Sequence, residues 1–332
     1  MELNENSDLD SGQVEDLRGS DGGGGGVFPG AAGSGGGGAL GGLIGGLLPM
    51  LFGRSKGLGC AVVILIVICV GAVLLFGGNL GSIAGLGGGK PADNTSIEKK
   101  CARNNPDRFT DTDCVNLAFV NSIQAYWKRG LPENFSRPYE SATTRFFSGQ
   151  VSTACGAADS GVGPFYCPGD RHVYIDLTFW DELAKRFGAP GQFAQAYVLA
   201  HEYGHHVQTL LGTEAQMRRA QQRDPGNANK YSVMLELQAD CYSGVWSKHA
   251  TETTDAQGTA IFKSLTQDDI NQALRAATAV GDDAIQKKMG GQVNESKFTH
   301  GSSEQRRQWF NQGYGTGDPK QCNTFGGALG QG

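Results

Sequence analysis

The sequence lacks three features, and each absence restricts what the protein can be. It has no long basic patch, and 33 aspartates and glutamates outnumber 28 lysines and arginines, so no nucleic-acid partner is expected. Residues 1–57 have too few large side chains to offset their ordering entropy, because half of residues 22–53 are glycine. Residues 58–76 contain no charged residue. The chain therefore divides into a tail that cannot build a core, an apolar stretch and a longer C-terminal part.

The apolar stretch predicts one transmembrane helix, residues 58–77, and hence a lipid bilayer as a partner. A signal peptide normally begins closer to residue 1, but Ser82-Ile-Ala84 resembles a cleavage site, so removal of the stretch stays an alternative. Arg54 and Lys56 precede the stretch, and no basic residue follows before Lys90. The positive-inside rule then predicts a single-pass membrane protein with a cytoplasmic N-terminus and a periplasmic or extracellular C-terminal part.

Composition also predicts the domain boundaries. Residues 1–57 are expected to be a disordered, Gly-rich cytoplasmic tail and residues 78–97 a linker. Residues 98–325 have the composition of a globular domain, and residues 326–332 are expected to be a flexible tail.

Six cysteines follow the apolar stretch, and an even number is typical of disulfides in an oxidising compartment. Proximity predicts the pairs Cys101–Cys114 and Cys155–Cys167, which leaves Cys241 for Cys322. The alternative is that some of them bind metal. Cys241 would point about 140° away from Glu236 on the same helix, which favours a structural role.

The strongest motif is H-E-x-x-H, which lies within an apolar run of helical period, residues 197–211. His205 falls about 40° round the helix axis from His201 and one turn further along, so both imidazoles can bind one ion while Glu202 stands beside them. Such a site needs an open position for water and a carboxylate that accepts its proton. The alternative is two partly buried core histidines with a surface glutamate between them.

A second pair of carboxylates follows 31 residues after His205, in a helical pattern over residues 231–246. Glu236 would complete the metal shell, and Asp240, one turn on, would accept the outer N–H of a bound imidazole. By itself this spacing is commonly only a solvated helix face. Its place downstream of H-E-x-x-H favours a third ligand and its neighbour.

The remaining pattern predicts an α+β fold, mostly helical with a small antiparallel sheet. Further helices are expected from residue 112 to a break before Gly130, over residues 181–187, up to residue 222, and over residues 267–280, with a loop at residues 282–291. Two short strands, residues 164–166 and 172–177, flank a turn. The second could pair with an extended peptide, or the two could be an ordinary hairpin packed on the core. Small residues at Gly204, Ala239 and Gly244 would allow the two site helices to approach closely.

His300 precedes a helix that Ser302 or Ser303 could cap. It could donate to the oxyanion of a tetrahedral intermediate, with Arg306 orienting nearby carboxylates. A histidine in this position is more often a surface or capping residue, and spacing does not decide between the two.

Several motifs together resemble the bacterial neutral zinc metallopeptidase family: V-E-D-L-R-G at residues 14–19, a Gly-rich tether, one span, H-E-Y-G-H-H-V-Q, E-L-Q-A-D-C-Y-S-G-V-W and T-H-G-S-S-E-Q-R-R-Q-W-F. This family is similar in turn to the gluzincin peptidases and implies a zincin-like domain. The resemblance implies zinc ligands at His201, His205 and Glu236 and a general base at Glu202. It implies a role for Asp240 behind the ligands, and it strengthens the assignment of His300 and Arg306, which match a six-residue spacing. Gly301 departs from the pattern, because the membrane-associated gluzincins usually have proline there.

These observations predict a membrane-anchored endopeptidase that binds one Zn²⁺ per chain and hydrolyses peptide or protein substrates. The alternatives are a non-catalytic membrane-tethered binding or scaffold protein with a zinc site, and a zinc amidase acting on cell-wall material. Structural zinc sites have four protein ligands, so a fourth ligand from His300 or Asp176 would favour the non-catalytic alternative.

Overall fold

The computed structural model describes residues 1–19 and 93–329. The helices are α2 (Thr95–Lys100), α3 (Thr112–Phe135), α4 (Phe179–Lys185), α5 (Gln192–Leu211), α6 (Thr213–Arg223), α7 (Ala228–His249), α8 (Gln267–Ala279), α9 (Asp282–Lys288) and α10 (Ser303–Thr316). The strands are β1 (Glu2–Leu3), β2 (Val14–Asp16), β3 (Thr143–Phe146), β4 (Gln150–Thr153), β5 (Gly156–Asp159), β6 (Phe165–Cys167), β7 (His172–Ile175) and β8 (Phe262–Ser264). The described part of the chain is thus α+β and mostly helical, as predicted.

The main sheet has the strand order β2-β3-β7-β6 and differs from the small antiparallel sheet that was predicted. Only β6 and β7 form the expected antiparallel hairpin, whereas β2 pairs with β3, and β3 with β7, in parallel. The parallel pairs arise because β2 comes from the start of the chain and the β4–β5 hairpin separates β3 from β7. The sheet is therefore mixed.

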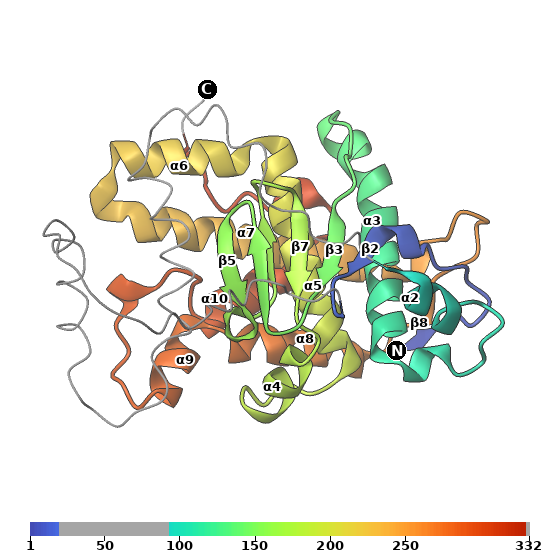
Figure 1. Cartoon of the computed structure of the whole chain (residues 1–332). Coiled ribbons are helices and arrows are strands. Elements are labelled where there is room, and N and C mark those ends of the chain that lie inside the picture. The colour runs from blue at the N-terminus through green and yellow to red at the C-terminus, as the bar shows by residue number, and fades with distance from the viewer. Residues whose placement is uncertain (20–92, 330–332) are drawn as a thin grey trace, which may run out of the picture. The chain divides into compact units, whose positions relative to one another are not determined.

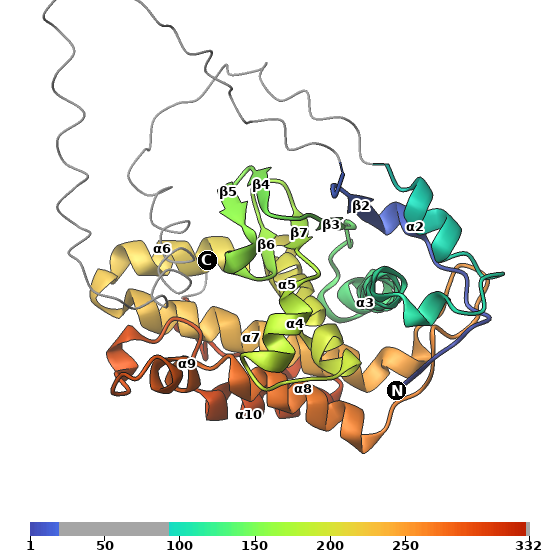
Figure 2. The ribbon, with the colours of Figure 1, turned by 60° about the horizontal axis from the view of Figure 1, so that its bottom comes forward.

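Helix α5 lies between this sheet and the helices α7 and α8, with α3 beside it and α10 packed on α7 (Figures 1 and 2). Helix α3 supplies much of the core, since its apolar residues Val115, Phe119, Ile123, Tyr126 and Trp127 are buried. The Asp111 side chain caps α3 by accepting a bond from the Asp113 N–H. The site helix therefore has packed structure on each side.

One predicted helix end and one predicted loop were wrong. Helix α3 does not stop before Gly130 but continues to Phe135, with Pro132 in its last turn. Gly130 is buried there, and its missing side chain gives the Tyr126 ring room. Residues 282–291, predicted as a loop, contain α9, whose acidic first turn and basic last turn suit the helix dipole.

The prediction of a disordered tail is wrong for residues 1–19. Residues 1–19 group with residues 93–329 in one compact unit, β1 pairs with β8, and β2 is an edge strand of the main sheet. Composition was misleading because the few apolar residues are well placed: Val14 is fully buried. The predicted linker is also partly structured, since α2 begins at Thr95.

All three predicted disulfides are confirmed: Cys101–Cys114, Cys155–Cys167 and Cys241–Cys322. The predicted transmembrane segment, residues 58–77, lies outside the described residues. Within residues 1–19 and 93–329, every helix is too short or too polar to cross a membrane.

Candidate metal centre

Helix α5 carries the H-E-x-x-H motif and forms because its apolar residues recur at helical spacing. Phe193, Leu199, Tyr203 and Val207 are fully buried, and the helix ends at Gly212, which adopts a left-handed φ of 76°. His201 and Glu202 are also buried, with 6% and 8% of their surfaces exposed. The motif therefore lies on the inner side of the helix.

Helix α7 approaches α5 at the level of the motif. A Cβ atom built on Gly204 would lie 3.0 Å from the Ala239 Cα and 3.1 Å from its Cβ and O. Gly204 lies between the two motif histidines, and Ala239 lies between Glu236 and Asp240. The predicted close approach is confirmed for this pair, whereas Gly244 faces the backbone of Phe310 on α10 instead.

The close approach brings the side-chain nitrogens and oxygens of the three predicted ligands together. The Nε2 atoms of His201 and His205 are 3.2 Å apart, the Glu236 Oε2 is 3.2 Å from the first, and its Oε1 is 3.5 Å from the second. Tetrahedral Zn²⁺ with bonds near 2.1 Å separates its ligand atoms by about 3.4 Å. The three side chains therefore fit zinc. In residues 1–19 and 93–329 they are the only group of histidine, cysteine or acidic side chains that could hold a metal ion.

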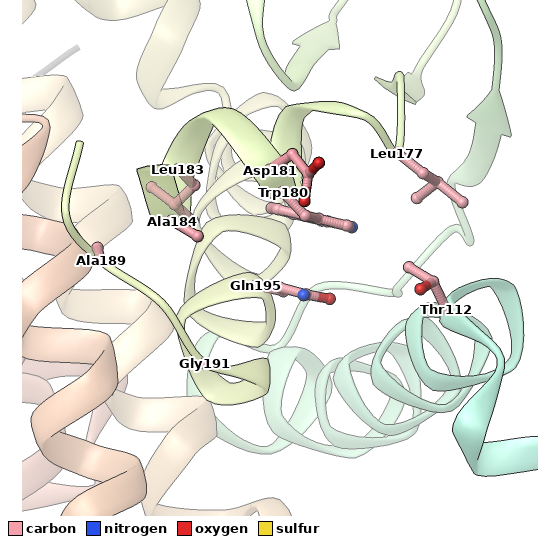
Figure 3. A pocket seen from close by; sticks show the side chains of 9 residues that line it. All are labelled: Thr112, Leu177, Trp180, Asp181, Leu183, Ala184, Ala189, Gly191 and Gln195. Carbon is pink, nitrogen blue, oxygen red and sulfur yellow. The ribbon is translucent and has the colours of Figure 1, made fainter. Parts of the chain in front are cut away.

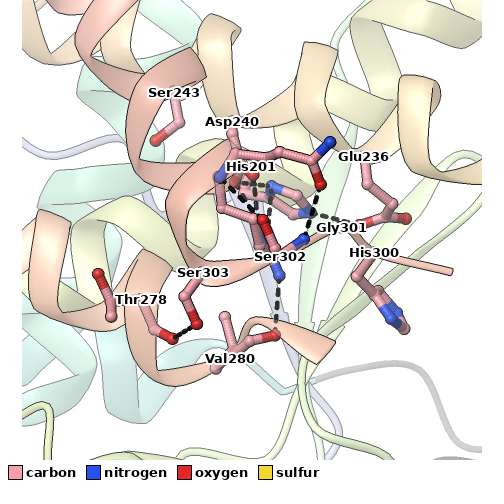
Figure 4. A network of polar contacts seen from close by, with 12 residues as sticks. His201, Glu236, Asp240, Ser243, Thr278, Val280, His300, Gly301, Ser302 and Ser303 are labelled. Atoms are coloured by element: carbon pink, nitrogen blue, oxygen red, sulfur yellow. Dashed lines mark hydrogen bonds and ion pairs between the residues drawn. The ribbon is translucent and has the colours of Figure 1, made fainter. Parts of the chain in front are cut away.

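A buried network fixes the orientation of His201 (Figure 4). Its Nδ1 donates to the Asp240 Oδ1 at 2.9 Å, which leaves Nε2 free to bind metal. Arg306 donates to both oxygens of Asp240, at 2.8 and 2.9 Å, and Tyr197 donates to its Oδ1 at 2.5 Å. The Asp240 carboxylate thus accepts from three donors, two on Arg306 and one on Tyr197, in addition to the Nδ1 of His201 that it orients.

A second chain of hydrogen bonds orients His205. Its Nδ1 donates to the Gln208 Oε1 at 2.9 Å, and the Gln208 Nε2 donates to the Leu235 carbonyl at 2.7 Å and the Gln238 Oε1 at 3.1 Å. The Gln238 Nε2 donates in turn to the Cys322 carbonyl at 2.9 Å. The second imidazole is therefore tied to α7 and to the Cys241–Cys322 disulfide.

The charges of the site suit a cation. Burial by itself raises the pKa of Glu236, but His205 and His201 lower it well below its usual range, so this carboxylate is ionised. Burial by itself lowers the pKa of His201, but the charge and hydrogen bond of Asp240 raise it overall. A metal ion and a proton therefore compete for His201.

Glu202 has the environment of a general base. Burial raises its pKa, while His201, His205 and a hydrogen bond from the backbone of Tyr166 act in the opposite sense, and the net shift is upward. A pKa raised towards neutrality suits proton transfer near pH 7. Tyr166 lies on β6, the edge strand of the main sheet.

His300 lies near Glu236 in Figure 4, and the charge of His300 lowers the pKa of Glu236. The Asp282 carboxylate holds His300 at two atoms. It accepts from the His300 backbone N–H at 2.7 Å and lies 3.2 Å from the His300 Nδ1. The structure gives a reason why this chain has glycine at position 301, where the membrane-associated gluzincins usually have proline. Gly301 has a φ of 96°, which proline cannot adopt.

Two other side chains, His206 and Asp176, do not belong to the group that could hold a metal ion. His206 follows His205 but points away from the three predicted ligands, donating to the Glu140 carbonyl and accepting from the Tyr166 hydroxyl. Asp176 accepts bonds from Ser160 and Thr178 and is not part of the group that could hold a metal. The prediction that residues 172–177 pair with a peptide is wrong. This segment contains β7, which is an inner strand, whereas β6 lies at the edge of the sheet.

Sequence reasoning missed Tyr197, Gln208 and Asp282. The first two carry a detectable signal, since Tyr197 lies four residues before His201 and Gln208 three residues after His205, on the same helix face. Asp282 had no such signal, because it lies on α9, which was predicted to be a loop.

A cavity of about 250 Å³ lies beside the first turn of α5, and the close-up in Figure 3 shows Trp180 and Gln195 extending into it. The buried Trp180 Nε1 has no hydrogen-bond partner among the described residues. Gln195 precedes His201 by six residues, which is about 9 Å along a helix. None of the predicted site residues lines this cavity.

A helical H-E-x-x-H motif joined by a glutamate from a second helix is the ligand set of zinc-dependent peptidases. The chain belongs to the family described as "Putative neutral zinc metallopeptidase", whose model matches residues 4–325.

The chain is also similar to proteins of two well-known bacteria. It is 48% identical over 228 residues to the uncharacterised protein Rv2575 of Mycobacterium tuberculosis (strain ATCC 25618 / H37Rv), covering 68% of this chain and 75% of that protein. It is 39% identical over 259 residues to the uncharacterised protein YpfJ of Escherichia coli (strain K12), covering 77% and 85%. No solved structure matches.

Proposed function

We propose that the protein is a zinc-dependent metalloendopeptidase with one Zn²⁺ per chain, bound by His201, His205 and Glu236. The observation that carries the proposal is the spacing of the ligand atoms. The two histidine Nε2 atoms are 3.2 Å apart, and the Glu236 oxygens Oε2 and Oε1 lie 3.2 Å from the first and 3.5 Å from the second, which is close to the spacing around tetrahedral zinc. The described residues supply three ligands and not four, which favours an open catalytic position over a structural site. Membership of a metallopeptidase family supports the same reaction class.

Zinc bound there would polarise a scissile carbonyl and make water acidic enough to react near pH 7. Glu202 accepts the proton of the attacking water and passes it to the leaving amine. His300 is held by Asp282 near Glu236 and donates to the oxyanion that develops on the carbonyl. Arg306 and Asp240 keep His201 in the tautomer that presents Nε2.

The substrate proposed is an extended peptide that pairs with β6. This strand has one sheet neighbour, β7, and its Tyr166 contacts both Glu202 and His206 of α5. A peptide added along this edge would lie beside the general base, and backbone hydrogen bonds would hold it.

We place the domain outside the cytoplasm, which the three disulfides support. Attachment to a membrane through residues 58–77 is part of the proposal and rests on their composition. The proposal does not extend to a cytoplasmic N-terminus, because residues 1–19 belong to the same compact unit as the metal site.

The test is to assay the purified full chain for zinc content and for hydrolysis of peptides and of cell-wall fragments, with and without a chelator. We expect one zinc per chain and chelator-sensitive peptide cleavage. The Glu202→Gln variant should keep zinc and lose turnover, whereas Glu133→Gln, a change at an exposed glutamate of α3, should leave both unchanged.

Two results would contradict the proposal in different ways. Cleavage of cell-wall fragments without peptide cleavage would identify an amidase. Full zinc occupancy without any hydrolysis would identify a binding or scaffold protein.

A further inference from the structure

Strand β2 is held on both edges by the rest of the domain. One edge pairs in parallel with β3, in the register Val14 to Thr144 and Glu15 to Arg145. On the other side the Asn94 side chain imitates a strand, donating to the Val14 carbonyl at 2.7 Å and accepting from the Asp16 N–H at 3.0 Å. The Val14 side chain is also fully buried. Strand β2 is therefore hydrogen-bonded and packed as part of the domain.

The preceding residues accept hydrogen bonds from a buried cation, Arg108, whose Nε has no partner among the described residues. Arg108 has 1% of its surface exposed, and no carboxylate forms an ion pair with it among the described residues. Its guanidinium donates to the carbonyls of Asn4, Glu5 and Ser7, at 3.2, 3.2 and 2.6 Å. The other carbonyl it reaches is that of Cys101, at 3.1 Å. A buried charge is tolerated only when it is hydrogen-bonded, so the domain is built around residues 4–7.

Ion pairs and side-chain bonds continue along the segment. Arg145 of β3 binds Glu15 at 2.6 Å, and Asp113 at the start of α3 binds Arg18 at 2.7 Å. The nearly buried Asn121 accepts from the backbone N–H of Asp10 at 2.7 Å and donates to its carbonyl at 3.1 Å. Contacts of this number and specificity require the segment to fold with the domain.

We infer that residues 1–19 and residues 93–329 lie on the same side of the membrane. A bilayer core is about 30 Å thick, whereas β2 and β3 must come within hydrogen-bond distance. An odd number of crossings between residues 20 and 92 would place the two partners on opposite faces. The N-terminal segment of a second copy would meet the same barrier, so exchange between chains does not change the inference.

The inference depends on the fold and not on the proposed peptidase activity. Together with the three disulfides, it places both segments in the oxidising compartment. Because the Glu202→Gln variant can fail or succeed without affecting it, the two proposals are tested separately.

The test uses paired cysteines in the full chain, in cells. Glu15→Cys and Arg145→Cys are introduced at register partners, in a Cys60→Ser, Cys69→Ser background, with a protease site inserted in the glycine run of residues 22–26. Free thiols are blocked before lysis, and the cleaved protein is run on a non-reducing gel. We expect the N-terminal fragment to stay attached in the double variant and to separate after reduction, and to separate in the Glu15→Cys control without reduction.

A labelling experiment identifies the compartment without requiring a cross-link. Asn6→Cys and Lys128→Cys, both at exposed positions, are treated separately in outer-membrane-permeabilised cells with a membrane-impermeant maleimide. We expect both to be labelled before lysis. Labelling of Lys128→Cys before lysis and of Asn6→Cys only after lysis would overturn the inference, whatever the cross-linking gives.

Discussion

Arg306 binds both carboxylate oxygens of Asp240, at 2.8 and 2.9 Å, directly behind the imidazole of His201. The pair is almost fully buried, with side-chain exposures of 5% and 0%. Arginine's planar fork makes both bonds at once, which a lysine ammonium cannot reproduce. The relationship connects α10 to His201, a proposed metal ligand on α5, through α7.

We predict that Arg306→Lys weakens zinc binding by roughly 10- to 100-fold, because Asp240 would no longer be held in place to orient His201. A competitive titration with a chromophoric chelator would measure this. The adjacent exposed Arg307 is the matched control, and Arg307→Lys should bind zinc as the unchanged protein does. Unchanged affinity in Arg306→Lys would show that the arginine does not position the ligand.

The bond from His205 to Gln208 predicts a similar effect on the second ligand. Gln208→Ala removes the acceptor for Nδ1 and should lower zinc affinity by roughly 10- to 100-fold. Gln208→Glu keeps an acceptor and should recover most of the affinity, although the Leu235 carbonyl loses its donor. Gln312→Ala, an exposed site on α10, is the control. Equal losses of zinc affinity in Gln208→Ala and Gln208→Glu would mean that Gln208 acts through packing and not by fixing the tautomer of His205.

His206 should make stability depend on pH. Burial lowers its pKa to about 4, against a normal value of 6.5, because the neutral ring is enclosed between Tyr166 and the Glu140 carbonyl. The unfolded chain therefore binds the proton more readily, so this contribution is complete above pH 6.5 and is lost as the pH falls towards 4. The slope is about 1.4 kcal/mol per pH unit in that window. Denaturant unfolding monitored by tryptophan fluorescence would measure it, and in His206→Gln this part of the slope should disappear.

Val14 provides a stability test of the N-terminal strand. Val14→Ala removes two methyl groups from a fully buried side chain and should lower the free energy of unfolding by about 2 kcal/mol. Asn6→Ala, at an exposed position in the same segment, should change it by less than about 0.5 kcal/mol. Equal unfolding midpoints for the two variants would indicate that residues 1–19 contribute nothing to the folded domain.

The group of side chains that could hold a metal ion was predicted from the sequence, because each member lies on a helix whose period fixes its direction. His201, His205, Glu236 and Asp240 needed only the 3.6-residue repeat and the assumption that two helices meet. The disulfides followed from proximity and elimination. Arg306 and His300 were suggested by a spacing that gains physical meaning only when α10 packs on α7.

The parts that sequence reasoning missed depend on contacts between distant segments. Val14 looked like an isolated apolar residue in a polar tail, because its partners on β3 lie 130 residues away. Parallel pairing has no local turn signal, which is why the mixed sheet was predicted to be antiparallel. Asp282 was overlooked for the same reason, since its role is to hold His300 from another element.

The contact between Gly204 and Ala239 also bears on which ions the centre can accept. At 3.0 Å from the Gly204 Cβ position, the backbone of α7 leaves no space for the two helices to move closer. The approach of Glu236 to the two histidines is thus limited by main-chain atoms, which yield less than rotatable side chains. This fixed distance between α5 and α7 suits an ion with bonds near 2.1 Å. It disfavours calcium, whose oxygen ligands lie about 2.3–2.6 Å away. A single methyl group added at Gly204 would increase the distance between α5 and α7. The metal centre would then be less selective for ionic radius.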